Sequence, residues 1–337
     1  NPNYEKVKFF QFYINIFKSK LKIVSGVRYI LGSVFSLFHA RFSGVKICHY
    51  HLFHVNILVL FDFILTKLLG MKVVYTIHDV VSYECSTPNE KLAKWIYKRV
   101  DKILTHNDFS MRVFKEHYTS IGTEIDVIPH GNYIPFLNIQ TDIITSKIHL
   151  GIPQDKKILL FFGMIKKVKG LELLLNSLKV VVENNPDVIL VIAGRVWENN
   201  FSVYQKIIDE NNLADHCIIH NKFIPNEDVD HYYASSDLIV LPYKQIYQSG
   251  VLMMSMSYEK AVLVSNLPPL IDVVQDMETG FVFESENPTS LANKLNLILL
   301  DMNNLERVRL NGSNLMKTKY DWSAIALLTK KSYQSIL

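Results

Sequence analysis

Apolar positions along this chain follow two different spacings in turn. Short apolar runs predict buried strands, and the segments between them place apolar residues at helical intervals. In the first part of the chain the predicted strands cover residues 22–27, 45–51, 72–77, 102–105 and 125–129. The predicted helices between them cover residues 27–42, 55–69, 89–100 and 111–118. Strands that alternate with helices predict a parallel sheet with helices on both faces.

The same alternation resumes after residues 133–155, which lack clear periodicity and which we interpret as a linker. The strands predicted there cover residues 157–162, 188–193, 217–220, 237–241 and 261–265, with a further strand after a turn at 279–281. The predicted helices cover residues 171–184, 203–211, 227–235, 288–300, 303–317 and 322–337. We therefore expect the α/β class, with two doubly wound Rossmann-like domains facing a cleft.

The pattern divides the chain into two domains and a C-terminal helix. We assign residues 1–150 to a first domain and residues 151–317 to a second domain. Residues 318–337 are predicted to form a helix whose apolar positions dock it back onto the first domain. The chain length of 337 residues agrees with two domains of ordinary size.

Residues 237–258 combine a strand, a polar loop and a helix start. Pro242 ends the apolar strand, and Ser249-Gly250 opens the apolar run VLMMSMSY. Such a helix start offers free N–H groups and the positive end of the helix dipole, and glycine lets an anion approach closely. The stretch therefore predicts a phosphate site, although an ordinary strand-to-helix turn has the same pattern.

Polar side chains also follow the predicted strands of the first domain. His51, His78, Asp79 and His130 all fall at the carboxyl ends of these strands, where parallel sheets bind ligands. In the second domain Lys169 lies in a basic loop after the strand at 157–162. A bound diphosphate would meet this lysine together with the amides of the helix start.

Composition excludes several classes of protein. Hydrophobic residues make up 49% and charged residues 20% of the chain, as in a well-packed globular protein. The three cysteines are widely spaced, so they indicate a reducing cytoplasm without a disulfide framework. The histidines show no metal-ligand spacing, so we expect no metal. No GxGxxG motif follows a strand, which argues against a dehydrogenase. The basic residues form no stripe, so we expect no nucleic-acid partner.

The charge distribution bears on possible membrane contact. Basic residues exceed acidic ones in residues 1–150, whereas residues 151–337 are slightly acidic. Residues 4–22 mix lysines with aromatic residues at helical spacing, which predicts either a helix on an anionic membrane or a packed surface helix with a solvated lysine face. We find no signal peptide and no run of 18 uncharged apolar residues.

Short motifs spread over most of the chain make it resemble a known enzyme family. They are FGMIKKVKG at 162–170, VIAG at 191–194, FIP at 223–225, SGVL at 249–252 with Gly280, TIHD at 76–79, IPHGNY at 128–133 and DWS at 321–323. With these motifs the chain resembles the retaining glycosyltransferases of family 4, the glycosyl transferases group 1, in a variant with an SGVL-type phosphate loop. The resemblance implies the GT-B fold with a C-terminal crossover helix.

The resemblance also implies roles for individual residues. It implies that Lys169 contacts the diphosphate of a nucleotide-sugar donor and that His78 lies near the transferred sugar. The residues expected to hold the donor are Gly163, Lys166, Lys169, Gly194, Phe223, Ile224, Ser249, Gly250, Val251 and Leu252. The residues expected on the acceptor side are His51, His130 and Asn132.

The chain departs from the family pattern at several positions. Many members carry two glutamates eight positions apart around this helix start, and the corresponding residues here are Tyr247 and Ser255. The arginine often found after the first glycine is Met164. The family's first strand and glycine-rich loop would precede Asn1, so we expect that part to be missing.

We therefore expect a metal-independent enzyme that moves a sugar from a UDP or GDP donor to a hydroxyl of a glycan or lipid-linked saccharide. His78, Asp79 and Lys169 are the expected catalytic residues, although Asp79 also suits a turn-capping role. The expected location is cytoplasmic, with peripheral contact to an anionic inner membrane surface during surface polysaccharide synthesis. The alternatives are a nucleotide-sugar epimerase of the same architecture and a non-catalytic nucleotide-sugar-binding or scaffold protein.

Overall fold

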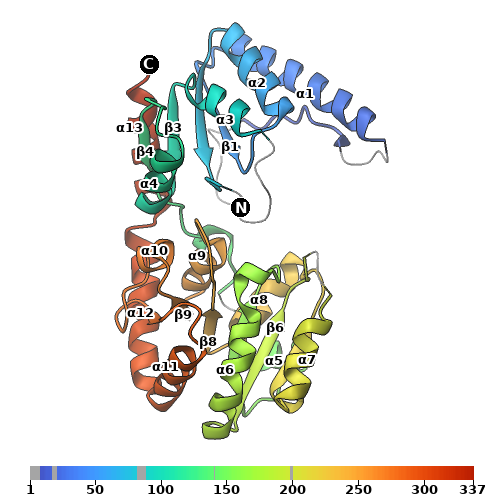
Figure 1. Ribbon diagram of the computed structural model, residues 1–337, viewed down its shortest axis with the longest axis vertical. Coiled ribbons are helices and arrows are strands. Elements are labelled where there is room, and N and C mark those ends of the chain that lie inside the picture. The colour runs from blue at the N-terminus through green and yellow to red at the C-terminus, as the bar shows by residue number, and fades with distance from the viewer. Residues whose placement is uncertain (1–7, 17–20, 82–88, 140, 198–199) are drawn as a thin grey trace. The chain divides into compact units, whose positions relative to one another are not determined.

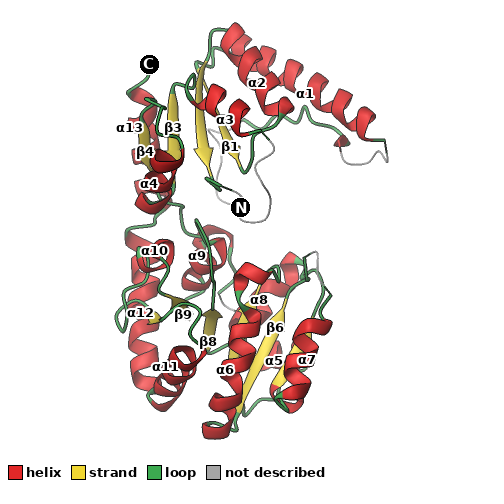
Figure 2. Cartoon of the chain, in the orientation of Figure 1, coloured by secondary structure: helices red, strands yellow, loops and turns green. Residues whose placement is uncertain are grey.

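The structure is a computed structural model that describes residues 8–16, 21–81, 89–139, 141–197 and 200–337. The chain divides into two compact units (Figure 1). The first unit combines Asn1–Pro129 with Ile325–Leu337, and the second is His130–Ala324. Each unit holds one parallel sheet and the helices that cover it (Figure 2). The α/β prediction with two doubly wound units is confirmed.

The sheet of the first unit has four parallel strands in the order β1-β2-β3-β4. They are β1 (Ile47–Leu52), β2 (Lys72–Ile77), β3 (Lys102–Thr105) and β4 (Ile125–Val127). The helices of this unit are α1 (Lys22–Phe42), α2 (Ile57–Leu68), α3 (Glu90–Tyr97) and α4 (Asp108–His117). The register aligns the carboxyl ends of β1 and β2, since Leu52 pairs with Ile77.

The N-terminal predictions were partly wrong. Residues 22–27 form the first turns of α1 rather than a strand, because their apolar residues continue the helical spacing of the residues that follow. Of the helix predicted at 4–22, residues 8–14 contain no helix, and residues 1–7 and 17–20 lie outside the described part. By length and composition α1 is apolar enough to cross a membrane, and it is the one such helix among the described residues.

The sheet of the second unit has six parallel strands in the order β10-β9-β8-β5-β6-β7. They are β5 (Lys157–Phe162), β6 (Val188–Ala193), β7 (Cys217–His220), β8 (Leu238–Leu241), β9 (Ala261–Ser265) and β10 (Phe281–Phe283). Its α-helices are α5 (Ile143–Leu150), α6 (Leu171–Asn184), α7 (Ser202–Glu210), α8 (Asn226–Ala234), α9 (Gly250–Ser257), α10 (Pro268–Ile271), α11 (Pro288–Leu300) and α12 (Met302–Thr318). Three short 3-10 helices, η2 (Ile134–Phe136), η3 (Lys167–Lys169) and η4 (Ala214–His216), connect them.

Both faces of this second sheet are buried. Along β5, Leu159 and Phe161 belong to one apolar cluster, while Ile158 and Leu160 belong to another. Successive strand residues point to opposite faces, so each cluster fills one side of the sheet. Each of these four apolar side chains is at most 2% exposed, and such burial stabilises the fold by roughly 1.5–3 kcal/mol per residue. This burial fixes the strand ends that carry the loops described below.

The division between the units differs from the boundary drawn at residue 150. Residues interpreted as a linker form helix α5, which packs on α8 of the second unit. Ser146 Oγ lies 3.0 Å from Nδ1 of His231 across this contact. Helix α5 has only eight residues, so its apolar positions give too weak a periodic signal to be recognised in the sequence.

The last helix, α13 (Trp322–Gln334), begins in the second unit and ends in the first. Its Ile325 joins an apolar cluster with Val74, Leu104 and Ile128 of the first sheet. Nearer the C-terminus, Tyr333 OH lies 2.6 Å from Nδ1 of His49. The first unit therefore has its core completed by the end of the chain.

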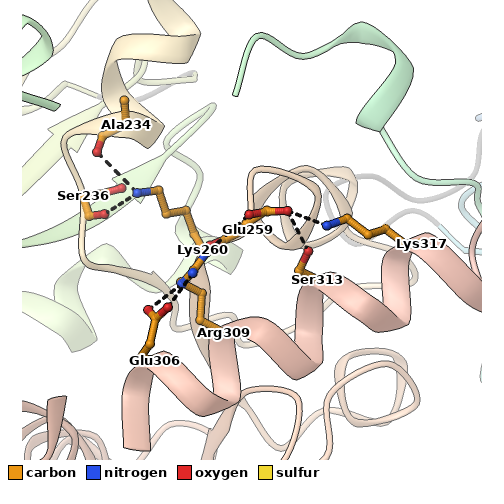
Figure 3. Close-up of polar contacts among 8 residues, drawn as sticks. All are labelled: Ala234, Ser236, Glu259, Lys260, Glu306, Arg309, Ser313 and Lys317. Carbon is orange, nitrogen blue, oxygen red and sulfur yellow. Dashed lines mark hydrogen bonds and ion pairs between the residues drawn. The ribbon is translucent and has the colours of Figure 1, made fainter. Parts of the chain in front are cut away.

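A half-buried lysine, Lys260, stands next to the N-terminal end of β9 (Figure 3). Lys260 Nζ donates hydrogen bonds to the carbonyl oxygens of Ala234, at 3.3 Å, and Ser236, at 3.0 Å. Desolvation by burial lowers the pKa of Lys260 to about 8. The adjacent Glu259 has a left-handed backbone, with φ of +57°, and its carboxylate accepts from Lys317 Nζ at 2.6 Å. This network lies at the amino-terminal edge of the sheet, away from the strand ends that carry the candidate site.

Candidate functional site

Two loops run side by side at the carboxyl ends of β5 and β6. Ile165 N–H donates to the Arg195 carbonyl oxygen at 3.0 Å, and Trp197 N–H donates to the Ile165 carbonyl oxygen at 3.0 Å. Glycine is required where the loops touch, because a Cβ on Gly194 would overlap the carbonyl oxygen of Gly163 and its φ is +148°. The structure thus brings together Gly163 and Gly194, which the sequence analysis proposed as neighbours in one site.

A pocket opens beside these two loops. Its cavity volume is about 480 Å³, within the range of about 300–1,000 Å³ that small-molecule sites occupy. The lining residues are Phe162, Gly163, Met164, Gly194, Arg195, Trp197, Phe223, Ile224, Asn226, Val229 and Met254. The predicted residues Phe223 and Ile224 therefore line the pocket, and Phe223 is 73% exposed. Two accessible aromatic rings, Trp197 and Phe223, suit a flat aromatic ligand.

The basic loop after β5 is held against the end of β8. It contains η3 and ends at Gly170, whose φ is +69° and whose Cβ would overlap the carbonyl oxygen of Pro242. Lys169 Nζ lies 3.7 Å from the ring centroid of Tyr243. Lys166 Nζ lies 5.3 Å from the ring centroid of Trp197 at the pocket. The loop therefore directs two ammonium groups to the carboxyl-terminal edge of the sheet.

Helix α9 begins with a side-chain cap and two open amides. Ser249 Oγ accepts a hydrogen bond from Leu252 N–H at 3.1 Å, so this amide is used by the cap. The N–H groups of Gly250 and Val251 have no acceptor among the residues that the structure describes. Two open amides at the positive end of a helix dipole are suited to bind an anion.

This helix start adjoins the pocket. A Cβ on Gly163 would lie 3.4 Å from a side-chain methyl of Val251, and Met254 of the same helix lines the pocket. On its other side, Tyr133 OH would lie 3.1 Å from a Cβ on Gly250. An additional methyl group at Gly250 would therefore crowd Tyr133. The pocket, the open amides and the β5 loop form one continuous site in the second unit.

The two positions at which a glutamate would be expected from the family pattern are buried. Tyr247 is 3% exposed and Ser255 is fully buried. Ser255 Oγ donates to the Val251 carbonyl oxygen at 2.6 Å, one turn earlier in α9. A hydroxyl that is bonded to its own helix is turned away from a ligand in the pocket. The structure therefore offers no replacement for the second glutamate at that position.

In the first unit, histidines gather at the carboxyl ends of β1, β2 and β3. His51 Nδ1 lies 3.0 Å from His78 Nε2, and Phe53 stacks on the His78 ring with centroids 4.5 Å apart. The His106 ring also lies close to His78, with ring centroids 4.9 Å apart. His49 contacts Tyr333 OH and Thr76 Oγ1, and burial, followed by the neighbouring imidazoles, lowers its pKa to about 4. Asp79 follows His78 directly in the chain.

These histidines form a hydrogen-bonded cluster rather than a ligand set for a metal. No group of three or more His, Cys, Asp or Glu side chains is placed to hold a metal ion within the described ranges. The cluster does provide polar groups at the carboxyl edge of the first sheet, where the sequence analysis expected His51 and His78.

The remaining predicted residues, His130 and Asn132, lie in the second unit. Asn132 is 2% exposed, its side-chain Nδ2 donates to the Met316 carbonyl oxygen at 2.9 Å, and its backbone carbonyl oxygen accepts from Trp322 Nε1 at 2.7 Å. His130 stacks on Tyr133, and burial lowers the pKa of His130. The Asn132 side chain and backbone are thus both used in fixing the start of the second unit.

Several residues at the site were missed by sequence reasoning. They are Tyr133, Arg195, Trp197, Asn226, Tyr243 and Met254. Trp197 had a usable signal, because it follows Gly194 closely in the loop after a predicted strand. Tyr243 had none, since its contact with Lys169 joins segments far apart in the chain.

The chain is similar in sequence to known glycosyltransferases. The family model described as "Glycosyl transferases group 1" matches residues 142–314, just over half of the chain. The chain is 26% identical over 282 residues to the putative glycosyltransferase YtcC of Bacillus subtilis, covering 79% of the chain and 68% of that protein. It is 25% identical over 255 residues to the lipopolysaccharide 1,2-N-acetylglucosaminetransferase of Salmonella typhimurium, covering 71% of the chain and 65% of that protein.

Solved structures have the same fold at lower sequence identity. The Anabaena protein Alr3699/HepE, in complex with UDP and glucose, superposes with a TM-score of 0.73 and 17% identity. The match covers 90% of this chain and 81% of that one. The chain spans about two thirds of the length of the two relatives named above.

Proposed function

Because the chain belongs to the glycosyl transferases group 1 family, we propose that it transfers a sugar from a nucleotide-diphosphate donor to a hydroxyl group of a saccharide acceptor. The acceptor class that we propose is a glycan or lipid-linked saccharide used in surface polysaccharide synthesis. The relationship to a lipopolysaccharide N-acetylglucosaminetransferase supports this class.

One observation carries the proposal: an aromatic-walled pocket adjoins a helix start with two open amides and a neighbouring lysine loop. The base and ribose would occupy the pocket between Trp197 and Phe223, and the diphosphate would lie at Gly250 and Val251. Lys169 would then meet the negative charge that develops on the leaving diphosphate. One well-placed donor group of this kind contributes about 3–4 kcal/mol to the stabilisation of a comparable transition state.

This assignment needs no further cofactor. The charge of the diphosphate would be balanced by Lys169, Lys166 and the first-turn amides of α9, so we propose transfer without a divalent metal. The UDP bound to the Anabaena protein makes UDP the first donor nucleotide to test, with GDP next.

On the side of the reacting sugar and acceptor, we propose roles for His78, Asp79 and His51. His78 would donate a hydrogen bond to the sugar, and His51 would fix the orientation of its ring through their 3.0 Å contact. Asp79 would act as a base only in an inverting reaction.

We also propose that the protein works in the cytoplasm at the inner face of an anionic membrane. Helix α1 supports this proposal better than residues 4–22 do, since Ile23, Phe35 and Phe42 are each more than 60% exposed and α1 contains no acidic residue. Pull-down with vesicles of anionic and of neutral lipid, at low and high salt, tests it. Equal recovery with both lipids would contradict it.

The central test is a thermal-shift titration without metal, using UDP, GDP, ADP and their sugars. A ligand that binds only the folded state raises the unfolding midpoint by mass action. We expect UDP or GDP to raise it and Lys169→Ala to remove most of the response. No response to any nucleotide in the wild-type protein would overturn the donor site.

The buried Tyr247 and Ser255 favour one alternative, a protein that binds a nucleotide sugar without transferring it. Incubation with the bound nucleotide sugar and a panel of saccharide acceptors separates the two. Release of free UDP or GDP together with a larger saccharide product indicates transfer, whereas unchanged donor indicates binding alone.

A further inference from the structure

Lys169 rests on the aromatic face of Tyr243, with Nζ 3.7 Å from the ring centroid. Tyr243 is 1% exposed, so packing fixes its ring. Its carbonyl oxygen accepts hydrogen bonds from Ser265 Oγ, at 2.6 Å, and from Ser285 Oγ, at 3.4 Å. A flexible cationic side chain therefore has a rigid aromatic surface beneath it.

The backbone around the two residues is also locked together. Lys244 N–H donates to the Val168 carbonyl oxygen at 2.9 Å, and Gly170 packs directly against the Pro242 carbonyl oxygen. The segments that carry Lys169 and Tyr243 are thus fixed to each other on both sides of the contact. The ammonium position follows from this backbone geometry together with the ring.

The acidic residue nearest to Lys169 along the chain is occupied by another partner. Glu172, in the first turn of α6, accepts a hydrogen bond at its Oε1 from Lys244 Nζ at 2.5 Å, and both side chains are 24% exposed. Lys169 itself makes no ion pair with a carboxylate in the part of the chain that the structure describes. A carboxylate partner would neutralise the charge of Lys169, whereas an aromatic face attracts the ammonium without cancelling its charge.

We propose that Tyr243 is a positioning residue for Lys169, and that Lys244 keeps Glu172 from pairing with it. The ring holds the ammonium at the end of β8 with its charge available to an anionic ligand. This inference rests on the proposed donor site for its functional meaning, since a diphosphate is the ligand that the charge would meet. The contact of Lys169 with Tyr243 is a property of the folded chain and is testable without any ligand.

The first experiment is therefore an NMR measurement on protein with ¹³C-labelled lysine. The Lys169 Cε signal is assigned by its loss in Lys169→Arg. We expect its attached protons to be shifted upfield by the Tyr243 ring current, with the shift retained in Tyr243→Phe and lost in Tyr243→Leu. A Lys169 signal at the position of exposed lysines in the wild-type protein would overturn the proposal, whatever the nucleotide measurements show.

The second experiment compares the affinities of UDP and uridine by calorimetry. Lys169 would contact only the diphosphate, so Tyr243→Leu should weaken UDP binding about three- to tenfold and leave uridine binding unchanged, which corresponds to a cation–π contact of ordinary strength. Tyr243→Phe keeps the ring and should bind UDP like the wild type. Equal weakening of UDP and uridine in Tyr243→Leu would show general damage to the site and overturn the positioning role.

A separate experiment tests whether Lys244 keeps Glu172 from pairing with Lys169. Lys244→Met should weaken UDP binding, because the released Glu172 carboxylate can then pair with Lys169. The double variant Lys244→Met, Glu172→Gln should restore binding, since the competing charge is gone. If the double variant stays as weak as Lys244→Met, masking of Glu172 is not the role of Lys244. A wild-type protein that shows the ring-current shift but binds no UDP would refute the donor site while leaving the positioning contact in place.

Discussion

The Nδ1 atom of His51 lies 3.0 Å from the Nε2 atom of His78, so one imidazole ring must donate to the other. Two fully protonated rings cannot keep this bond, because both facing nitrogen atoms would carry a hydrogen. His51 therefore influences both the orientation and the tautomer of His78. Phe53, stacked on His78, restricts the same ring from its face.

Replacing His51 should lower the rate of sugar transfer without changing nucleotide binding. We expect His51→Phe to reduce kcat/KM about tenfold, which is the value of one net hydrogen bond of about 1.4 kcal/mol. His51→Asn keeps a polar partner for His78 and should retain more activity. Steady-state kinetics and UDP calorimetry check the prediction, and a loss of UDP affinity in His51→Phe would contradict it.

The first unit should lose stability in mild acid because of His49. Burial lowers the pKa of His49 to about 4 from 6.5, so the folded state resists protonation that the unfolded chain accepts. The contribution of neutral His49 to the unfolding free energy is complete above pH 6.5, and it is lost as the pH falls toward 4. Its size is on the order of 2–3 kcal/mol, since the ring retains some solvent contact.

Urea denaturation of the wild type and His49→Gln between pH 7.5 and 4.5 measures this contribution. Glutamine does not titrate in this range and keeps a polar partner for Tyr333 and Thr76. The difference in unfolding free energy between the two proteins should therefore shrink or reverse as the pH falls. A difference that stays constant with pH would show that His49 does not carry the effect.

Lys260 should make the second unit more stable in mild alkali. Its pKa of about 8 lies below the ordinary 10.5, so the folded state holds an unfavourable buried charge below pH 8. That cost, roughly 3 kcal/mol, is relieved as the pH rises from 8 toward 10.5. The unfolding free energy of the wild type relative to Lys260→Met should therefore increase over this range. Lys206→Met, at an exposed position, is the matched control and should show no such change.

Gly194 should not tolerate any side chain. A Cβ there would overlap the Gly163 carbonyl oxygen, and a φ of +148° is unfavourable for other residues. We expect Gly194→Ala to lower the unfolding free energy by about 2–4 kcal/mol and to weaken nucleotide binding. Gly26→Ala, inside α1 with no atom within 4 Å of the new methyl, should instead be neutral or stabilising by up to about 1 kcal/mol. Thermal unfolding and UDP titration of both variants check the pair.

The strands of the second unit could be predicted from the sequence because they are buried on both faces. Residues 158–162 and 188–193 form continuous apolar runs followed by glycine, and the structure has β5 and β6 at residues 157–162 and 188–193. The helical start at residues 22–27 could not be recognised, since Ile23, Val24 and Val27 also suit a strand and only the continuing helix decides between them. Helix α5 was missed because its burial depends on α8, which lies far away in the sequence.

The candidate site could be predicted to a similar degree. Gly163, Lys169 and Gly250 follow strands or open a helix, and parallel topology alone brings such positions to one edge of a sheet. Leu252 was expected among the donor-binding residues, and the structure shows its amide donating to the Ser249 cap. The Tyr243 ring under Lys169 depends on how two loops pack, and no local pattern specifies that packing.

Helix α13 has a consequence for the order in which the chain can fold during synthesis. The first unit takes its last core residues from Ile325–Leu337, so the ribosome finishes the whole second unit before the first has all its parts. Residues up to Pro129 must wait with an incomplete core, in a state that exposes apolar surface to aggregation or to chaperones. Removing α13 would therefore destabilise the first unit, although the helix and the sheet whose core it completes lie far apart in the chain.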